Sequence, residues 1–278
     1  NKITSIKKLV RECNRINRTG TIDSVLAILK TVILTDSTFI LWQETIRALI
    51  DIEAYNETLE LIENMPREYV DKSLYIRQQQ GFVLNRLHKP YDAIEILEKC
   101  LNDFGEDPET YGLLGRIYKD FYKSTSEAEI EKREGYLDKA IETYLKGFYI
   151  EPSNYFTGIN AANLLFLKNT KDSINKMQEI LTVINFTLSN NNSLFGNYWG
   201  LATMLNVKIL MQDFYVGYEQ ILPRLISMNI PAWKFKTTKR TIDSIVDVYS
   251  EKGKPSDYLL KIQNAFNQRI SELDVIVS

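Results

Sequence analysis

The sequence feature that most constrains the fold is a spacing of aromatic and small residues that recurs along the chain. In one stretch, Tyr111, Leu114, Gly115 and Tyr118 stand in the order aromatic-x2-Leu-Gly-x2-Tyr. Another glycine, Gly81, lies 34 residues upstream of Gly115. A period of about 34 residues is typical of chains that repeat one pair of antiparallel helices. Because a single pair cannot bury its apolar face, the spacing predicts a stack of such pairs.

This spacing resembles the tetratricopeptide repeat, in which a small and an aromatic residue of the second helix pack against the first helix and a proline closes the unit. Ala140, Tyr144 and Pro152 stand in these places after Gly115, and Ala93 has the same role after Gly81. We therefore predict an all-α, tetratricopeptide-like, right-handed superhelical solenoid of about seven antiparallel helix pairs. The residues that we assign to structural positions of the repeat are Gly81, Ala93, Tyr111, Leu114, Gly115, Tyr118, Ala140, Tyr144, Pro152, Asn160, Trp199 and Trp233.

The repeats differ in clarity along the chain. Residues 1–107 hold degenerate repeats that begin with a helical pair expected at 3–17 and 22–34. Residues 108–278 hold the clearer repeats and end in an amphipathic helix that is expected to cap the stack. We expect the two segments to form one continuous solenoid.

An insertion at about 119–136 interrupts the repeat that begins at Pro108. It adds about 13 residues to the usual distance between the two helices of a unit. We predict a lengthened first helix, a polar loop and a lead-in to the second helix. Ser126 and Glu129 are spaced as a capping box, in which each side chain hydrogen-bonds the backbone of the other.

Composition and charge exclude several classes of function. The net charge is -2, which argues against a role that depends on attraction of the whole surface to nucleic acid or membrane. No run of about 18 apolar residues predicts a membrane span. Cys13 and Cys100 both fall in helical patterns and fit a reducing compartment, so we predict a cytoplasmic protein. The chain begins with Asn rather than Met, and we expect it to be part of a longer protein.

Residues for catalysis or metal binding do not come together in the sequence. His88 is the single histidine and lies in a Leu-His-Lys-Pro turn. A zinc site needs clustered Cys and His, and the sequence has no phosphate-binding glycine motif. We therefore predict no enzyme activity, no cofactor and no metal site.

From residue 108 onward, short blocks resemble a more specific family. They are Gly-Arg-Ile-Tyr-Lys-Asp at 115–120, Glu-Pro at 151–152, Gly-Ile-Asn at 158–160, Leu-Leu at 164–165, Tyr-Trp at 198–199 and Pro-Ala-Trp-Lys-Phe-Lys at 231–236. In this order they resemble the TRAF-binding, tetratricopeptide-like central regulatory domain of the apoptosis signal-regulating kinases, which are MAP kinase kinase kinases, and its bacterial relatives.

The resemblance implies a regulatory module that recruits adaptor proteins and helps hold a kinase ready for activation. This sequence has no Gly-rich loop, no Val-Ala-Ile-Lys and no His-Arg-Asp, so the effector would lie outside it. In a bacterial protein only the general role would apply, because TRAF proteins are eukaryotic. We therefore predict a protein or peptide partner and leave the oligomeric state open.

The repeat geometry assigns a set of polar side chains to a concave face. Arg116 and Lys119 are expected to face this groove, whereas Tyr111 and Tyr118 face the stack. Arg suits bidentate recognition of a carboxylate, and Lys adds a point charge. The alternative is a set of solvated helix faces with an internal salt-bridge cluster. The predicted partner-binding groove consists of Gln43, Arg47, Gln78, Asn85, Arg86, Arg116, Lys119 and Asp120.

A second basic cluster follows Trp233, which we expect to be a core anchor. Lys234, Lys236, Lys239 and Arg240 lie close together with no acidic residue among them. They predict a patch for an anion or an acidic partner. Interleaved aromatic and basic residues also suit nucleic acid, which the overall charge of the chain disfavours.

Three functions therefore stay open, in this order. The first is an interaction and regulatory module of a signalling protein. The second is a sensor that binds a small anionic ligand through Arg116, Lys119 and nearby side chains. The third is an RNA-binding solenoid. Asn160, which stands where repeats usually have a small residue, is expected to make a structural hydrogen bond.

Overall fold

The computed structural model describes residues 39–190, 197–230, 232–251, 253 and 255–277. Every regular element within these residues is a helix, which confirms the all-α class. The helical pair expected at 3–17 and 22–34 lies outside the described residues, and so does Cys13, so the count of about seven pairs stays a prediction. The chain divides into two compact units, the first ending at Glu106 and the second beginning at Asp107.

The first unit is built from helix pairs. Helix α3 (Phe39–Asp51) packs on α4 (Tyr55–Glu63), and α6 (Leu74–Arg86) packs on α7 (Pro90–Phe104). A short helix that the sequence did not predict, α5 (Arg67–Asp71), lies between the pairs. The unit therefore repeats one supersecondary structure, as the spacing predicts.

Helices α6 and α7 approach each other closely at Gly81. A Cβ atom added at Gly81 would lie 2.7 Å from Cγ of Leu97. Ala93 and Leu97 of α7 are fully buried at this crossing. Two helices come this close only where one of them carries no side chain, so Gly81 and Ala93 have the packing role predicted for them.

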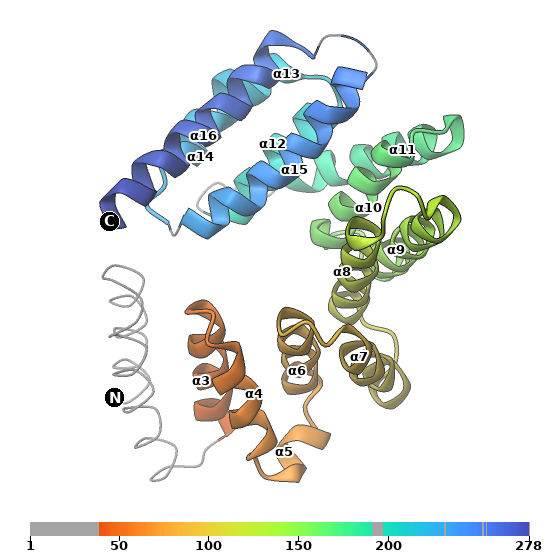
Figure 1. Ribbon diagram of the computed structural model, residues 1–278, viewed down its shortest axis with the longest axis vertical. Helices are drawn as coiled ribbons and strands as arrows, with labels where there is room; N and C mark the ends of the chain where they lie inside the picture. The colour runs from red at the N-terminus through yellow and green to blue at the C-terminus, as the bar shows by residue number, and fades with distance from the viewer. Residues whose placement is uncertain (1–38, 191–196, 231, 252, 254, 278) are drawn as a thin grey trace. The chain divides into compact units, whose positions relative to one another are not determined.

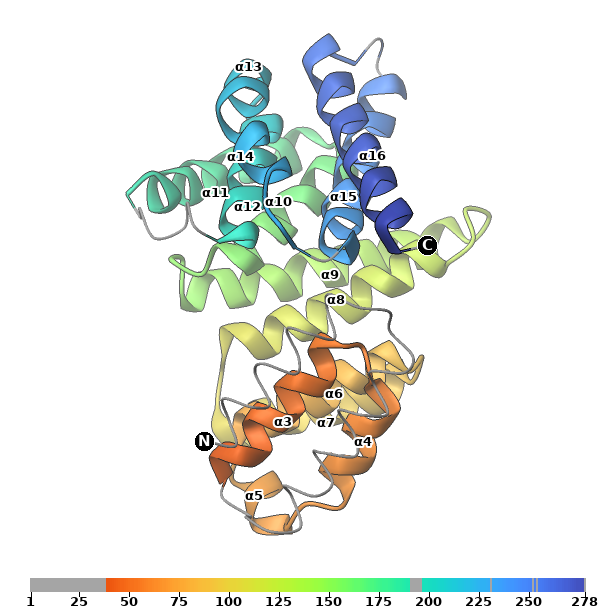
Figure 2. The same ribbon diagram turned by 90° about the vertical axis from the view of Figure 1, so that its left-hand side faces the viewer.

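The second unit continues the same architecture (Figures 1 and 2). Its elements are α8 (Pro108–Ser124), α9 (Ile130–Ile150), α10 (Tyr155–Lys168), α11 (Lys171–Ser189), α12 (Tyr198–Leu210), α13 (Phe214–Val216), the π-helical turn η2 (Gly217–Ile221), α14 (Leu222–Ile226), α15 (Ala232–Glu251) and α16 (Asp257–Val277). Helix α8 pairs with α9, α10 pairs with α11, and α9 also packs on α10. Stacked pairs of this kind bury each other's apolar faces.

The α8–α9 pair is closed by Gly115 and Tyr144. A Cβ atom at Gly115 would lie 2.8 Å from Cγ of the Tyr144 ring. The ring is fully buried, and so is Ala140 one turn before it. Leu114 is also buried, whereas Tyr111 and Tyr118 are half-buried along the side of α8. The sequence therefore places the aromatic ring of the second helix against a glycine of the first.

The insertion lengthens both helices of this pair. Helix α8 continues to Ser124, and α9 begins at Ile130. The capping box expected of Ser126 and Glu129 is not formed. The Ser126 hydroxyl instead accepts a hydrogen bond from the backbone N–H of Ala128 at 3.3 Å, because the helix begins only after Glu129.

Phe235, rather than Trp233, anchors α15 in the core. Phe235 is fully buried, and its ring centroid lies 5.3 Å from that of Tyr198, which is also buried. Trp199 is 37% exposed and packs against the half-buried Trp233 at 6.0 Å. The expectation that Trp233 is the core anchor was therefore wrong, and Trp199, assigned to a structural position of the repeat, lies at the surface. Successive helical residues point about 100° apart, so the burial of Tyr198 and Phe235 leaves the tryptophans nearer the surface.

Helix α15 packs against α10, although α11 to α14 separate them in the chain. The ring centroid of Phe166 in α10 lies 5.3 Å from that of Tyr249 in α15. In Figure 1, α15 (blue) runs next to α12. This return of the chain brings a late helix beside the second unit's first repeats, and it creates the site described next.

Candidate functional site

A row of basic side chains runs along one face of α8. Arg116, Lys119 and Lys123 are spaced three and four residues apart, so they lie on the same side of the helix. Lys119 is half-buried, and its Nζ donates a hydrogen bond to Oδ1 of Asn160 at 2.8 Å. The same ammonium lies 5.6 Å from the ring centroid of Tyr144. The packing of the repeat therefore fixes the position of this charge.

Two asparagines on α10 face this row. Asn160 Nδ2 donates to the backbone carbonyl of Phe156 at 2.8 Å, so its amide holds α10 and Lys119 together. Asn163, three residues later, lies on the same side of α10. Its Oδ1 atom is buried and has no hydrogen-bond partner among the described residues. A buried acceptor of this kind calls for a hydrogen-bond donor, which the described residues do not supply.

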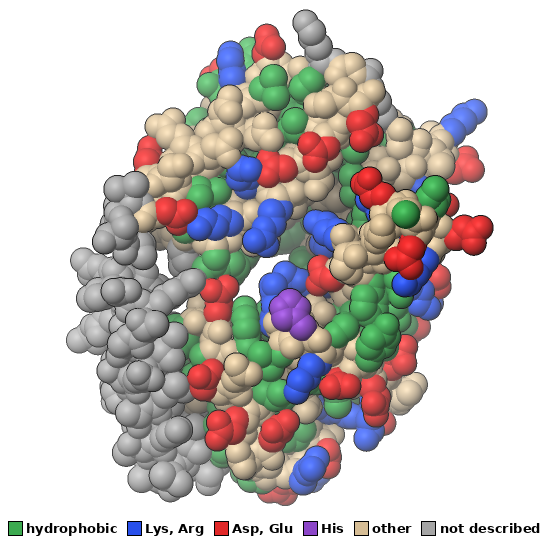
Figure 3. Space-filling view, viewed as in Figure 1, with side chains coloured by type: hydrophobic (Ala, Val, Ile, Leu, Met, Phe, Trp, Pro, Cys, Tyr) green, Lys and Arg blue, Asp and Glu red, His purple; other side chains and the backbone are tan. Residues whose placement is uncertain are grey.

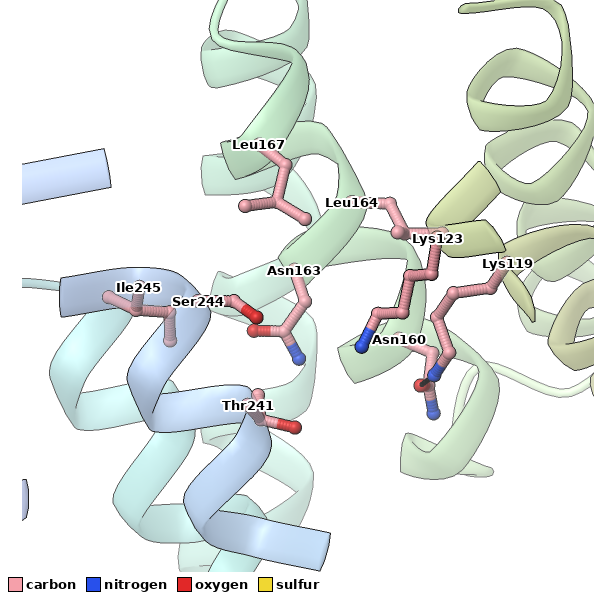
Figure 4. Close-up of a pocket in the computed structure, with 9 residues that line it drawn as sticks. All are labelled: Lys119, Lys123, Asn160, Asn163, Leu164, Leu167, Thr241, Ser244 and Ile245. Carbon is pink, nitrogen blue, oxygen red and sulfur yellow. Dashed lines mark hydrogen bonds between the residues drawn. The ribbon is translucent and has the colours of Figure 1, made fainter. Parts of the chain in front are cut away.

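These side chains line a pocket between α8, α10 and α15 (Figure 4). Its volume is about 40 Å³. Helix α15 contributes the hydroxyl groups of Thr241 and Ser244. No lining residue carries a carboxylate. The lining residues are Lys119, Lys123, Asn160, Asn163, Leu164, Leu167, Thr241, Ser244 and Ile245.

The electrostatics of the pocket are dominated by positive charge. Lys123 is exposed, but partial desolvation of its ammonium group lowers its pKa. Asp120 acts in the opposite direction, while the like charges of Arg240 and Arg116 lower the pKa further. Among the described residues, Lys123 forms no ion pair within 4 Å. The pocket therefore combines hydrogen-bond donors with an excess of positive charge.

The groove residues predicted in the first unit differ in their burial and in their contacts. Gln78 is only 6% exposed, so its assignment to an open groove was wrong, because it lies on the packed side of α6. Arg47 is exposed and pairs with Glu44 at 3.3 Å. Arg86 lies over the ring of Phe82 at 5.1 Å. Gln43 and Asn85 are half-buried.

The basic run of α15 is partly neutralised by two acidic residues, one on α16 and one later on α15 itself. Lys236 pairs with Asp274 of α16 at 3.0 Å, and Lys239 pairs with Asp243 at 2.6 Å. Lys234 lies over the Trp233 ring, and Arg240 is exposed. Figure 3, viewed as in Figure 1, shows basic side chains (blue) among acidic ones (red) on this face of the second unit. The run is therefore less basic than its sequence suggests.

A rival surface lies on α11. Val183 and Phe186 are three residues apart, and they are 40% and 71% exposed. Exposed hydrophobic residues can mark a protein interface. Two apolar side chains alone do not indicate which kind of partner would cover them, whereas the charges around Lys123 do.

Four polar pocket residues escaped the sequence analysis: Lys123, Asn163, Thr241 and Ser244. Helical spacing could have indicated two of them, since Lys123 follows Lys119 by one turn and Asn163 follows Asn160 by nearly one turn. Thr241 and Ser244 could not be connected to α8 without the packing of α15.

The class of protein is defined by these stacked helix pairs, which make the chain a tetratricopeptide-like helical repeat protein. A family model described as the MAP3K TRAFs-binding domain matches residues 4–262, so the chain belongs to this family. The resemblance inferred from the blocks after residue 108 is therefore confirmed.

The chain is similar to several curated kinases. It is 28% identical over 197 residues to mouse mitogen-activated protein kinase kinase kinase 15, which covers 67% of this chain and 14% of that protein. Human mitogen-activated protein kinase kinase kinase 5 is 25% identical over 203 residues, which covers 70% of this chain and 14% of the kinase. The chain thus spans only a small part of the length of these relatives.

Solved structures of helical repeat proteins share the fold. A monomeric mutant of IFIT1 with m7Gppp-AAAA superposes with a TM-score of 0.55 and 13% identity, covering 98% of this chain and 62% of IFIT1. A thermophilic TPR protein of Thermus thermophilus gives a TM-score of 0.50 and 11% identity, covering 83% of this chain and all of that chain. These likenesses confirm the tetratricopeptide-like solenoid class. Within the described residues, no helix has the length and apolar character to cross a membrane.

Proposed function

We propose that the chain is a non-catalytic interaction and regulatory module of a signalling protein, which binds a segment of a protein partner and controls an attached or associated effector. The description of its family names TRAF binding, and its curated relatives are protein kinases much longer than this chain. A regulatory domain of such a protein would act by contact, because the chain carries none of the sequence blocks of a kinase.

The observation that carries this proposal is the basic and amide-rich face of α8 and α10. Arg116, Lys119 and Lys123 follow one another along α8, and Asn160 holds Lys119 in place at 2.8 Å. A preorganised row of donors loses little side-chain entropy when a ligand binds. Its charge favours a segment that carries acidic groups, and electrostatic complementarity gives such a contact its specificity.

The first unit would provide further contacts to the partner. Arg47 and Arg86 retain the guanidinium groups that suit carboxylates, and Gln43 and Asn85 add amides. We no longer include Gln78, which is buried. Asp120 is exposed next to the basic row and would restrict binding to segments that place a donor or a cation opposite it.

A double charge reversal tests this proposal. We expect Arg116→Glu with Lys119→Glu to weaken binding of a TRAF-class adaptor by about tenfold or more, because the acidic segment would meet two like charges. The matched control is Lys99→Glu with Lys171→Glu, two exposed lysines with the same change in net charge. Surface plasmon resonance with the full chain measures the affinities.

Circular dichroism establishes that both double variants remain helical. Equal affinity of the wild type and the Arg116/Lys119 variant would reject this face as the binding site. Equal loss in both double variants would show that only net charge matters.

A second candidate is a sensor for a small anionic ligand. The pocket volume of about 40 Å³ and the absence of lining carboxylates favour it. Such a sensor would melt at a higher temperature in the presence of a small metabolite alone, whereas an interaction module would respond to its protein partner. RNA binding is less well supported, because Asp274 and Asp243 pair with two of the four cations in the basic run.

A further inference from the structure

The lining of the pocket indicates the sign of its ligand. It presents two ammonium groups, two amides and two hydroxyls, and none of the nine residues is acidic. Arg116 and Arg240 add positive potential at Lys123, against the single carboxylate of Asp120. A metal cation would be repelled by this arrangement and would find no carboxylate ligand in the lining. An anion would satisfy both the charge and the donors.

The directions of the donors indicate the shape of the ligand. Lysines reach the pocket from α8, the Asn163 amide from α10 and the Thr241 hydroxyl from α15, so donors come from three helices (Figure 4). The Asn160 amide and the Ser244 hydroxyl already donate to the backbone carbonyls of Phe156 and Arg240. A carboxylate offers two oxygens in one plane, whereas a phosphoryl group offers three terminal oxygens arranged in three dimensions. Two lysines also match the charge of a phosphate dianion, for which lysine is a common binder.

The size of the pocket limits what can enter. A single buried water needs a cavity of about 10–15 Å³. The pocket has a volume of about 40 Å³, so it holds roughly three waters. One tetrahedral oxyanion is of this size, but a nucleoside or a sugar is not. The rest of a larger ligand would have to stay outside the opening.

We propose that the pocket between α8, α10 and α15 binds one phosphoryl group, held by Lys119 and Lys123, by the amide N–H of Asn163 and by the hydroxyl of Thr241. The assignment of this group to a protein partner, as a phosphorylated side chain, rests on the proposed function. Free inorganic phosphate is the other source with the same chemistry.

Binding would connect distant parts of the second unit. The two lysines belong to the first helix of the unit, and Thr241 lies at the middle of α15. A phosphoryl group between them would add contacts that hold α15 against α8 and α10. Because a ligand stabilises the state that binds it, the α15 packing would tighten when the group is present.

Isothermal titration of the full chain tests the proposal directly. The probes are inorganic phosphate, N-acetylphosphoserine amide and acetate, at constant ionic strength with chloride as the balancing anion. We expect saturable binding of one phosphate per chain and much weaker binding of acetate. Tighter binding of the phosphoserine derivative than of inorganic phosphate would identify a phosphorylated side chain as the source, and the reverse order would identify the free ion.

Three variants locate the binding site. Lys123→Gln should weaken phosphate binding by about tenfold or more, since it removes a charged hydrogen-bond donor. Asn163→Asp should abolish binding, because it places a carboxylate in the pocket, and this carboxylate can pair with Lys123 and so preserve the fold. Lys171→Gln, on the exposed start of α11, should bind phosphate like the wild type.

Absence of saturable phosphate binding to the wild type would overturn the proposal. So would equal binding of acetate, or equal affinity of the Lys171→Gln and Lys123→Gln chains. A wild type that binds its protein partner but not phosphate would overturn only this inference and leave the proposed function intact. A wild type that binds phosphate but no protein partner would overturn the proposed function and leave the phosphate site intact.

Discussion

Replacing Tyr144 by alanine is expected to lower the free energy of unfolding by about 3–5 kcal/mol. The ring is fully buried against Gly115, where even one added carbon would lie 2.8 Å from it. Removing it leaves a cavity at the centre of the α8–α9 crossing. The matched control is Tyr149→Ala, whose side chain is 54% exposed and should cost less than about 1 kcal/mol. Chemical denaturation of the full chain measures both.

Tyr144→Phe separates the ring from its hydroxyl. The hydroxyl oxygen is buried without a hydrogen-bond partner among the described residues, and burial raises the pKa of this phenol, so it stays neutral. Removing an unpaired buried hydroxyl should leave stability unchanged or increase it. A large loss in Tyr144→Phe would show that the hydroxyl has a partner, and a small loss in Tyr144→Ala would refute the packing described for this repeat.

Replacing Phe235 by alanine is expected to have an effect of similar size, about 3–5 kcal/mol, because this ring is also fully buried. It contacts Tyr198 and Phe266, with ring centroids 5.3 and 6.2 Å away. The loss should fall on the packing of α15, so the variant should also bind phosphate more weakly. Differential scanning calorimetry and the phosphate titration measure the two effects.

Trp233→Ala is the control for this second prediction. Trp233 is larger than Phe235 but only half-buried, and it packs on the exposed Trp199. We expect it to cost clearly less than Phe235→Ala. The reverse order would show that the tryptophan, as expected from sequence alone, is the anchor of α15.

The repeat frame could be predicted because it depends on local spacing. Gly81 and Gly115 stand where two helices cross, and a side chain there would collide with Leu97 or Tyr144. This requirement is visible in sequence as a small residue at a fixed distance from an aromatic or aliphatic one. The choice between Trp233 and Phe235 was not visible, because both are apolar and their burial depends on the rotation of α15 about its axis.

The pocket could be predicted only in part. Lys119 was found because the repeat pattern places it opposite the packed face of α8. Thr241 and Ser244 were missed because a regular helical repeat predicts contacts only between helix pairs that are consecutive in the chain. In the structure, α15 packs on α10. Gln78 was misplaced because the geometry that assigns Arg116 and Lys119 to a groove was applied to the preceding repeats, and in the structure Gln78 is 6% exposed.

The claim on which this account depends is that the partner binds at the face formed by α8, α10 and α15. Hydrogen–deuterium exchange of the full chain, with and without a bound TRAF-class adaptor, tests it most directly. We predict slower exchange in residues 116–124, 160–168 and 241–246 on binding. Slower exchange confined to α11 around the exposed Val183 and Phe186, with those three segments unchanged, would contradict the account.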